Sequence, residues 1–518
     1  MSLKSNFGRR DLFRGGLLAS LWPGKAASAA PAGVYEAIGV RPLINARGTF
    51  TIISGSLMLP EARAAMTEAA QRHVHIDELM DAIGARLAEL TKAEWGLVSC
   101  GCSAALTHAT AACVAGGNPD LHVRIPNLHG FAKDEAIIPK HSRNVYDAAV
   151  RSVGVRVIEV GTMEELEAAL GPRTAMIYIL AGPNANREPL STEAICRAAK
   201  PRGVPVLVDA AAEILTVPNV HLEKGATLVA YSGGKCIRGP QTAGLLLGRK
   251  DLVKAAWVHS SPHHGYARSM KIGKEEAIAM LTAVEMWMKR DHEAEFREWM
   301  RRLGDIAVRV SAIEGVSTSI RQPDDLSNRT PTLMIRWDAA KLGITGAAVS
   351  KILFTTEPRI ALPTGRMGGN SGETGVSVVP YQMMAGEEKI VGDRIFEVLK
   401  NPPKQEPPAH DPPSADVTGR WDVHIDYLAS ASDHVLHLRQ QESRIEGTHQ
   451  GDFVSRDVGG SIEGNRVRLM SNVTERHGDS LSFEFTGKVE GDQMSGTLSM
   501  GEYLEARWSA RRHAFRRG

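Results

Sequence analysis

One lysine stands in a loop of small residues and follows an apolar segment that ends in an acid. Residues 231–244 place Lys235 among serines and glycines, and the strand-like residues 204–209 end in Asp209. Such a lysine amine forms a Schiff base with pyridoxal phosphate (PLP), and a carboxylate against the pyridinium nitrogen keeps the ring able to accept electrons. The pair predicts a PLP site; a solvated lysine on a glycine turn is the alternative for so short a motif.

A glycine-containing turn is a candidate for binding the phosphate of PLP. Residues 95–100 have the pattern of a strand, and residues 103–115 that of an alanine-rich helix. Between them lie Gly101, Cys102 and Ser103. Amides at a helix N-terminus bind phosphate, and small side chains let it approach. The alternative is an ordinary turn between a strand and a helix.

Other polar residues are candidates for holding the ring or the substrate. His141 follows a predicted strand, where it would stack on the cofactor ring, or it is a satisfied surface histidine. Glu213, four residues after Asp209, is either near the substrate or solvated. Arg359 and Arg366 would grip a substrate carboxylate through two parallel hydrogen bonds. Because the chain has 61 lysines and arginines, a solvated arginine is a strong alternative.

Apolar runs alternate with amphipathic ones over residues 31–299, which predicts an α/β domain with a mostly parallel sheet covered on both faces. Residues 300–400 mix the two patterns and predict a smaller α+β domain. The predicted strands of the large domain are residues 95–100, 135–138, 155–160, 175–180, 204–209, 228–232 and 243–247, and the predicted helices are residues 81–90, 103–115, 192–200 and 275–289.

The composition changes after residue 400. Residues 401–416 are rich in proline and predict a semi-rigid linker. Residues 417–512 then alternate polar and apolar side chains, with turn signals at hairpin spacing. About eight short strands without a helix predict an antiparallel β-barrel. Trp421 and Trp508 would plug the barrel, or they are core aromatics of a sandwich.

Length, charge and cysteine content exclude several classes. A chain of 518 residues is too long for one core. Its 43% hydrophobic and 23% charged residues are typical of an ordinary soluble protein. The net charge of +2 gives no reason to expect nucleic acid or an anionic membrane as partner. Five cysteines at these spacings predict neither a disulfide framework nor a metal site.

The N-terminus has the pattern of an export signal. Arg9 and Arg10 form a twin-arginine pair, which a short, weakly apolar segment and a tract of small residues follow. Residues 27–29 are typical of a cleavage site, and the segment is too short to span a bilayer. Residues 1–30 are therefore a predicted signal peptide for export of the folded protein to the periplasm; a disordered basic tail is the alternative.

Four stretches resemble a known family. Residues 43–49, 140–147, 206–213 and 232–241 are similar to the selenocysteine-synthase-like branch of fold-type I PLP enzymes, and especially to the D-glucosaminate-6-phosphate ammonia-lyase group. The resemblance covers about residues 34–398 and implies a large domain like those of the class V aminotransferases. The C-terminal strands resemble a lipocalin-like barrel.

The resemblance implies roles for the residues named above. Lys235 would carry the Schiff base, Asp209 would contact the pyridinium nitrogen and His141 would lie over the ring. Ser232 and the turn at residues 101–103 would hold the phosphate.

Enzymes of this kind form dimers or larger rings, so the resemblance also implies a homo-oligomer. Gln241 and Thr242 would then reach the phosphate of a neighbouring subunit. The residues assigned to the substrate are Asn45, Thr49, Arg143 and Arg359.

These residues predict a PLP-dependent lyase. Lys235 would remove the α-proton, and loss of a β-hydroxyl would convert a hydroxy amino acid or amino-sugar acid into a 2-keto acid and ammonia. A racemase, an aldolase and an aminotransferase remain alternatives, because the outcome depends on which bond stands perpendicular to the ring. A non-catalytic periplasmic binding protein is a further alternative. Predicted export and the added barrel depart from the family pattern and disfavour a sugar phosphate, since phosphorylated metabolites are scarce outside the cytoplasm.

Overall fold

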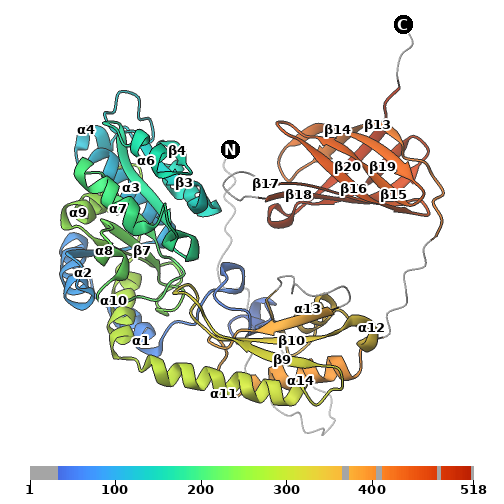
Figure 1. Cartoon of the computed structure of the whole chain (residues 1–518), viewed down its shortest axis with the longest axis horizontal. Coiled ribbons are helices and arrows are strands. Elements are labelled where there is room, and N and C mark those ends of the chain that lie inside the picture. Colours follow the sequence, from blue (N-terminus) through green and yellow to red (C-terminus); the bar gives the residue numbers. More distant parts are fainter. Residues whose placement is uncertain (1–32, 364–372, 404–410, 475–479, 515–518) are drawn as a thin grey trace, which may run out of the picture. The chain divides into compact units, whose positions relative to one another are not determined.

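The computed structural model describes residues 33–363, 373–403, 411–474 and 480–514 (Figure 1). The predicted signal peptide and Arg366 lie outside the described residues. Residues up to Leu43 form one unit, in which the described part contains a single 3-10 turn, Glu36–Ile38. The rest of the chain forms the second unit. In the part of the chain that the structure describes, no helix combines the length and apolar character that crossing a bilayer requires.

A seven-stranded sheet of order β2-β8-β7-β6-β5-β3-β4 forms the centre of the large domain. All neighbours are parallel except β8, which runs antiparallel to β2 and β7. The predicted α/β class and the mostly parallel sheet are thus confirmed. The strands are β2 (Trp95–Ser99), β3 (Glu135–Pro139), β4 (Arg156–Val160), β5 (Thr174–Leu180), β6 (Val206–Asp209), β7 (Leu228–Ser232) and β8 (Gly244–Gly248).

Helix α3 is the most buried helix of this domain. Every one of its residues except Ser103 is buried, and its alanines let it pack closely against the sheet at β8. The helices of the large domain are α1 (Pro60–Ala69), α2 (Ile76–Thr91), α3 (Cys102–Ala115), α4 (Pro119–His122), α5 (Ala148–Arg151), α6 (Met163–Ala169), α7 (Thr192–Ala199), α8 (Val220–Glu223), α9 (Lys250–Val258) and α10 (Lys274–Lys289).

The smaller domain has a core of its own around an antiparallel sheet of order β12-β10-β9. Ile44 and Ala46 belong to this core, since β1 (Ile44–Asn45) pairs with β11 (Ile360–Ala361). The local sequence pattern around β1 could not predict this pairing, because its partner strand is distant in the chain. The remaining elements are β9 (Ser317–Arg321), β10 (Thr332–Asp338), β12 (Glu373–Val378), α11 (His292–Val310), α12 (Ala339–Leu342), α13 (Gly346–Thr355) and α14 (Glu387–Lys400).

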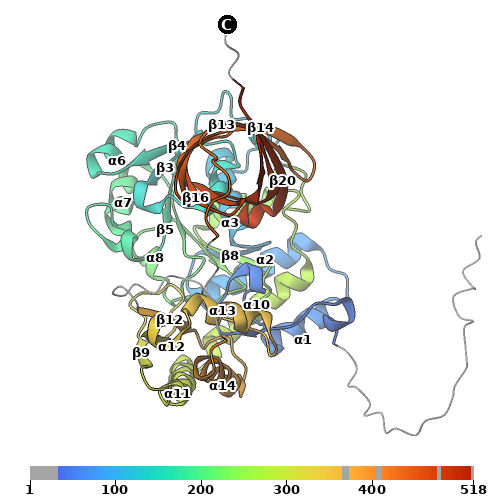
Figure 2. The ribbon, with the colours of Figure 1, turned by 90° about the vertical axis from the view of Figure 1, so that its right-hand side faces the viewer.

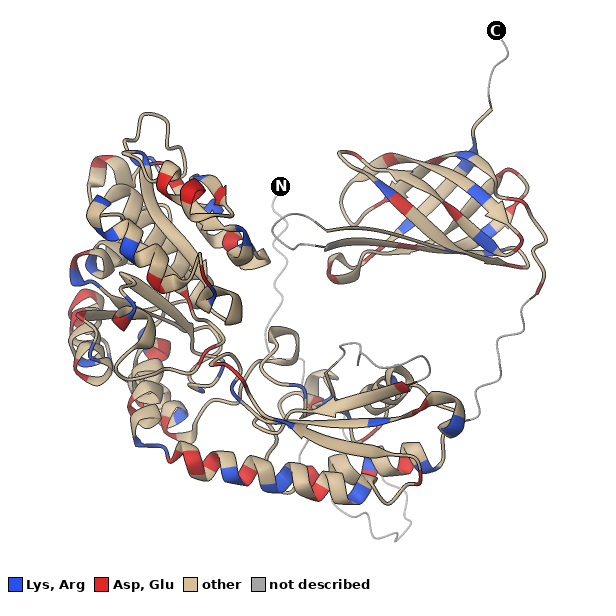
Figure 3. Ribbon diagram, viewed as in Figure 1, with Lys and Arg blue, Asp and Glu red and all other residues tan. Residues whose placement is uncertain are grey.

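Helix α11 crosses the predicted boundary at residue 300. Leu303, Ile306 and Val310 bury one face of it in the smaller core. Acidic and basic residues alternate along the rest of the helix (Figure 3), and Arg301 pairs with Glu298. Exposed pairs of this kind add little to stability. The helix is therefore held mainly by its apolar face.

Eight antiparallel strands close the C-terminal domain into a barrel (Figure 2), as predicted. Trp421 and Trp508 are both buried in it, and the Trp421 indole donates to the Val417 carbonyl at 2.8 Å. The end of the linker is attached to it, because the Ser414 amide donates to the Gly464 carbonyl. The strands are β13 (Gly419–Asp426), β14 (Ala431–Gln441), β15 (Arg444–Gln450), β16 (Ser455–Glu463), β17 (Arg466–Thr474), β18 (Ser480–Glu490), β19 (Gln493–Ser499) and β20 (Glu505–Arg512).

Helix α3 also carries a buried imidazole, that of His108. Both ring nitrogens of His108 are buried without a hydrogen-bond partner among the described residues, and burial lowers the pKa of His108 from 6.5 to about 4. Because the unfolded chain binds a proton more readily, stability should fall as the pH drops from about 6.5 towards 4, by about 3 kcal/mol in total.

We expect His108→Leu to remove this pH dependence and to stabilise the protein by about 1–3 kcal/mol at pH 7, since no buried polar atom is then left unsatisfied. Urea unfolding between pH 4 and 7 measures both effects. The exposed His129, changed to leucine, is the control. Equal pH slopes in the wild type and His108→Leu would contradict the prediction.

Candidate active site

The carboxyl ends of the parallel strands bring the predicted residues to one edge of the large-domain sheet. Asp209 is the last residue of β6, and Lys235 follows the end of β7. The turn at residues 101–103 follows β2. The antiparallel β8 begins at this same edge, because Gly244 pairs with both Ser99 and Ser232. A doubly wound sheet collects its functional groups at such an edge.

Asp209 is a buried carboxylate with donors on its protein side. It is 2% exposed and accepts hydrogen bonds from the Tyr178 hydroxyl at 2.9 Å and the Ala211 amide at 3.1 Å. The Cys102 thiol lies 3.7 Å away. Burial raises the pKa of Asp209. The three donors and the nearby charge of Lys235 act in the opposite direction and lower it. A protonated ring nitrogen would give the carboxylate the cation that its burial calls for.

Lys235 is half-buried and lines a cavity of about 610 Å³, hereafter the lysine cavity. Its loop needs small residues for its own packing. A Cβ at Gly234 would lie 2.7 Å from Cα of Gln241, and a Cβ at Gly233 would lie 2.7 Å from Sδ of Met280. The glycines therefore let the lysine loop fold against residues 240–243.

The turn at residues 101–103 forms the N-terminus of α3. Gly101 is its N-cap with φ 104°, and no side chain caps the helix there. A Cβ on Gly244 would lie 2.3 Å from the Gly101 carbonyl carbon, so the turn packs directly on β8. Its first amides have no partner within the helix and suit an anion. Amine, buried carboxylate and free helix amides together fit PLP.

His141 is held by the protein through both ring nitrogens. Nε2 lies 3.2 Å from the Leu190 carbonyl oxygen and Nδ1 lies 3.0 Å from the Ser142 hydroxyl. These contacts fix the plane of the imidazole. Its stacking on the cofactor remains a prediction.

Asn45 ends β1, and Thr49 belongs to the loop that follows it beside Lys235. The Asn45 Oδ1 accepts from the Arg47 and Gly48 amides at 3.0 Å, so Asn45 shapes the loop from its base. Thr49 lines the lysine cavity, and both its amide and its hydroxyl bind the Tyr381 hydroxyl. Asn45 is thus placed as a positioning residue and Thr49 as a wall residue.

Two predicted arginines are engaged elsewhere. Arg143 is nearly buried and forms ion pairs with Asp147, at 2.5 Å, and with Glu159. Arg359 donates from Nε to the Phe354 carbonyl at 2.9 Å and lies over the ring of that residue. Neither is among the described residues that line the lysine cavity. These contacts favour structural roles for both arginines.

Arg47 lines the lysine cavity, as does Arg321. Its guanidinium lies 4.3 Å from the centre of the Phe50 ring, and its Nε is buried without a hydrogen-bond partner among the described residues. A planar, unsatisfied donor at this place suits a carboxylate. Arg47 is absent from the predicted set although it stands in residues 43–49, because the pattern alone does not tell which side chain of that loop faces Lys235.

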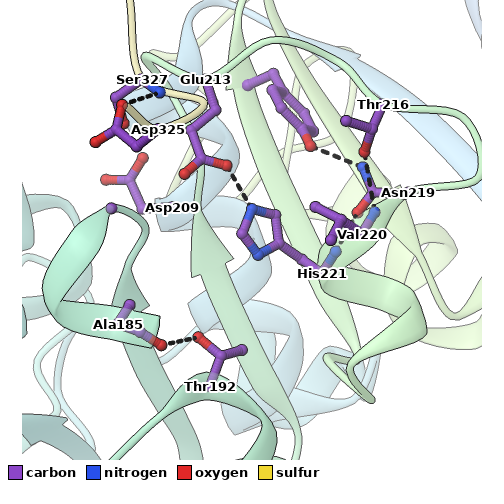
Figure 4. A network of polar contacts seen from close by, with 12 residues as sticks. Ala185, Thr192, Asp209, Glu213, Thr216, Asn219, Val220, His221, Asp325 and Ser327 are labelled. Carbon is purple, nitrogen blue, oxygen red and sulfur yellow. Dashed lines mark hydrogen bonds and ion pairs between the residues drawn. The ribbon is translucent and has the colours of Figure 1, made fainter. Parts of the chain in front are cut away.

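Glu213 is not solvated. It is 4% exposed, and its Oε2 lies 2.5 Å from Nε2 of the buried His221 (Figure 4). Asn219 accepts from the His221 amide and donates to the Tyr231 hydroxyl at 2.7 Å. The network anchors the loop that follows Asp209. A backbone bridge from Glu213 to Ser327 joins this loop to the smaller domain.

The remaining wall of the lysine cavity is polar. Hydroxyl and carboxylate groups from the smaller domain and from the loop at residues 47–51 face it. Such a wall suits a substrate with several hydroxyl groups. The polar wall residues include Thr49, Asp324, Asp325, Ser327, Thr332 and Ser377.

Gly244→Ala should weaken PLP binding by at least about tenfold, because its Cβ would displace the Gly101 carbonyl and the Cys102 amide. Titration of the cofactor-free protein with PLP measures this. Gly304, on α11 with open space around it, provides the control variant Gly304→Ala. Equal affinities in the two variants would overturn the assignment of this turn.

Arg47→Gln should lower the affinity for amino acids by about 10- to 100-fold, since a charged hydrogen bond is lost. Affinity is read from the change in the cofactor spectrum for an amino acid and for the amine that lacks its carboxylate. Only the amino acid should be affected. Arg359→Gln is the matched control. If Arg359→Gln shows the loss and Arg47→Gln does not, the carboxylate is bound by Arg359.

Known proteins of similar sequence support this geometry. The aminotransferase class-V family model matches residues 137–268. The D-glucosaminate-6-phosphate ammonia lyase of Salmonella typhimurium is 29% identical over 377 residues, which are 71% of this chain and 98% of that protein. A solved structure of D-glucosaminate-6-phosphate ammonia-lyase has a TM-score of 0.64 at 28% identity and covers 72% of this chain and 99% of its own.

Two further relatives carry other activities in their names. The 5'-C-glycyluridine monooxygenase-decarboxylase of a Streptomyces species is 31% identical over 340 residues, covering 63% of this chain and 83% of that protein. The L-seryl-tRNA(Sec) selenium transferase of Moorella thermoacetica is 26% identical over 317 residues, covering 54% and 64%. The chain belongs to the family of PLP-dependent enzymes that contains these relatives.

Proposed function

We propose that this protein is a PLP-dependent ammonia-lyase. Its substrate is an unphosphorylated hydroxy amino acid or amino-sugar acid, and its products are a 2-keto acid and ammonia. One observation carries the proposal: Lys235 opens on a polar cavity beside the buried Asp209, in a chain that aligns with nearly the whole of an ammonia lyase.

The chain's own residues divide the work. Bound PLP supplies an electron sink for the negative charge that develops at the α-carbon. Asp209 holds the proton of the ring nitrogen, and its burial keeps that interaction away from water. When Nζ of Lys235 is not bonded to PLP, it can act as a base and remove the α-proton of the substrate. The same amine then delivers a proton to the departing β-hydroxyl, which leaves as water. Hydrolysis of the remaining enamine then releases ammonia and the keto acid.

Predicted export supports an unphosphorylated substrate, because phosphorylated metabolites are scarce outside the cytoplasm, and the lysine cavity offers partners for a carboxylate and for hydroxyl groups. Arg47 faces the cavity as the partner for the α-carboxylate. Asp324 and Asp325 stand on the same wall, and Asp325 already accepts a hydrogen bond from the Ser327 amide. The two carboxylates accept hydrogen bonds from hydroxyl groups, and Arg321 on the same cavity offsets their negative charge, so the wall suits a substrate with several hydroxyl groups.

Location and assembly complete the proposal. Arg9 and Arg10 support export by the twin-arginine route to the periplasm. A homo-oligomer would place Gln241 and Thr242 near the phosphate of a neighbouring subunit. Gln241 is half-buried and Thr242 is exposed in the single chain, which leaves both able to take part in such a contact.

Other outcomes at the same site are distinguished by their products. The names of the relatives include a monooxygenase-decarboxylase and a selenium transferase, so the family does not fix the reaction. Racemisation, aldol cleavage and transamination all begin at the same α-carbon. The non-catalytic alternative is disfavoured, because both Lys235 and Asp209 are present and lie at the same edge of the sheet.

The test is a screen of hydroxy amino acids and amino-sugar acids with the PLP-loaded protein. Ammonia and 2-keto acid should appear in equal amounts. Lys235→Ala should lower the rate by at least about a thousandfold, since the general base is lost. Asp209→Asn should keep PLP attached to Lys235, detected by mass after borohydride reduction, but lose most of the rate.

Keto acid without ammonia would replace the lyase by an aminotransferase. An inverted substrate would indicate a racemase, and an aldehyde with glycine an aldolase. Absence of PLP on Lys235 would refute the catalytic assignment altogether. Oxygen consumption with release of carbon dioxide would point to oxidative decarboxylation instead.

A further inference from the structure

The hydroxyl group of Tyr178 is buried inside the sheet and has two hydrogen-bond partners there. Tyr178 lies in β5 and is 0% exposed. Its hydroxyl oxygen lies 2.9 Å from Oδ2 of Asp209 and 3.0 Å from Nδ2 of Asn144. A phenylalanine would fill almost the same space without a buried polar atom to satisfy. The hydroxyl group therefore serves these two contacts rather than the packing of the strand.

The hydrogen bonds of Asn144 fix the direction of this chain of contacts. Its Oδ1 accepts from the Tyr146 amide at 2.8 Å, which identifies the other terminal atom as the amide nitrogen. That nitrogen donates to the Ser142 carbonyl at 2.8 Å and to the Tyr178 hydroxyl. Because Asn144 donates to the Tyr178 oxygen, the Tyr178 proton is left to point at Asp209. Burial and the charge of Asp209 raise the pKa of Tyr178, so the hydroxyl keeps that proton.

Tyr178 has one oxygen of Asp209 to itself. Among the described residues it is the one donor to Oδ2, whereas the Ala211 amide and the Cys102 thiol share Oδ1. Burial raises the pKa of Asp209, and Tyr178 counteracts this more than any other neighbour. A hydroxyl that itself accepts a hydrogen bond is polarised and donates more strongly. Without it, the carboxylate would hold a proton more tightly.

The same network reaches the histidine that is predicted to stack on the ring. The Ser142 hydroxyl lies 3.0 Å from Nδ1 of His141, and the Ser142 carbonyl accepts from Asn144. Asn144 therefore links the loop of His141 to the acid at the end of β6. Asn144 stands in residues 140–147, one of the four stretches that carry the family resemblance, but the sequence pattern predicts no role for it.

We propose that Asn144 and Tyr178 form a positioning relay that keeps Asp209 ionised. The proton between the Asp209 carboxylate and the ring nitrogen of PLP then stays on the nitrogen. A positively charged ring is the stronger electron sink, so the relay favours loss of the α-proton. The inference rests on PLP bound at Lys235, which the proposed function also requires, and holds for any bond of the substrate that is broken.

The test is the ¹⁵N NMR signal of the ring nitrogen in the full-length protein loaded with labelled PLP. This signal distinguishes a protonated from a neutral ring nitrogen and needs no substrate. We expect a protonated nitrogen in the wild type. Tyr178→Phe should move the signal towards that of a neutral nitrogen. The ratio of the two forms should change by at least about tenfold, because a hydrogen bond to a charged group is lost.

Asn144→Asp is the second variant. It keeps the shape of the side chain and the acceptor for the Tyr146 amide, but its carboxylate attracts the Tyr178 proton instead of donating to the hydroxyl. The signal should therefore move in the same direction as in Tyr178→Phe. If Asn144 only shaped its loop, the signal would stay in place. This variant decides alone if Tyr178→Phe does not hold PLP.

The strand on the other side of β6 offers matched controls. Tyr231 of β7 is 1% exposed, and its hydroxyl accepts from Nδ2 of Asn219 at 2.7 Å. Oδ1 of Asn219 accepts from the His221 amide, as Oδ1 of the relay asparagine accepts from an amide. Within the described part of the chain, no hydrogen bond joins this pair to Asp209. Tyr231→Phe and Asn219→Asp should therefore leave the signal at the wild-type position. The mass of Lys235 after borohydride reduction shows whether each variant holds PLP.

Three results would overturn the inference. They are a neutral ring nitrogen in the wild type, an unchanged signal in Tyr178→Phe, and equal shifts in Tyr178→Phe and Tyr231→Phe. The signal also separates this inference from the proposed reaction. Shifts as expected, without ammonia from any substrate, would refute the lyase and keep the relay. Ammonia release with a signal that neither Tyr178→Phe nor Asn144→Asp moves would do the reverse.

Discussion

A negative charge buried at the end of β6 constrains the whole site. Asp209 lies at the centre of the sheet, where its carboxylate is shielded from water, and its direct partners among the described residues are neutral donors, from Tyr178, Ala211 and Cys102. The charge of Lys235, which lies on a neighbouring loop, lowers the pKa that burial raises. The arrangement is poised for a flat cation between the acid and the lysine, because a buried charge is stable only when it is paired.

Close backbone contacts keep that arrangement at the sheet edge. The turn at residues 101–103 lies directly on Gly244, and the lysine loop lies on Gln241, in both cases through glycines that leave no room for a Cβ. The antiparallel β8 makes this possible, since it starts where its neighbours end and so brings its first residues to the site. The turn at residues 101–103 and the lysine loop thus support each other through one strand.

Local patterns were sufficient to predict the sheet, the barrel and the positions of Lys235 and Asp209, because buried parallel strands are continuous apolar runs and barrel strands alternate. Contacts between segments far apart in the chain cannot be predicted from local sequence patterns. The pairing of Ile44 with Ile360, the ion pairs that engage Arg143 and the inward orientation of Arg47 all depend on packing between segments far apart in the chain. The alternative that Glu213 is solvated is wrong for the same reason, because its partner His221 lies on a separate short helix.

The smaller domain determines how a substrate lies once its reacting carbon is fixed at Lys235. Backbone bonds between residues 212–214 and 326–328 join its loop to the segment after Asp209, so the loop carries the acids and hydroxyl groups to the lysine cavity at a set distance. Tyr381 lines the lysine cavity, and its hydroxyl is bonded to Thr49, in the loop that presents Arg47. The guanidinium groups of Arg47 and Arg321 and the carboxylates of Asp324 and Asp325 all line this cavity, so it offers partners for both charges of a zwitterionic substrate.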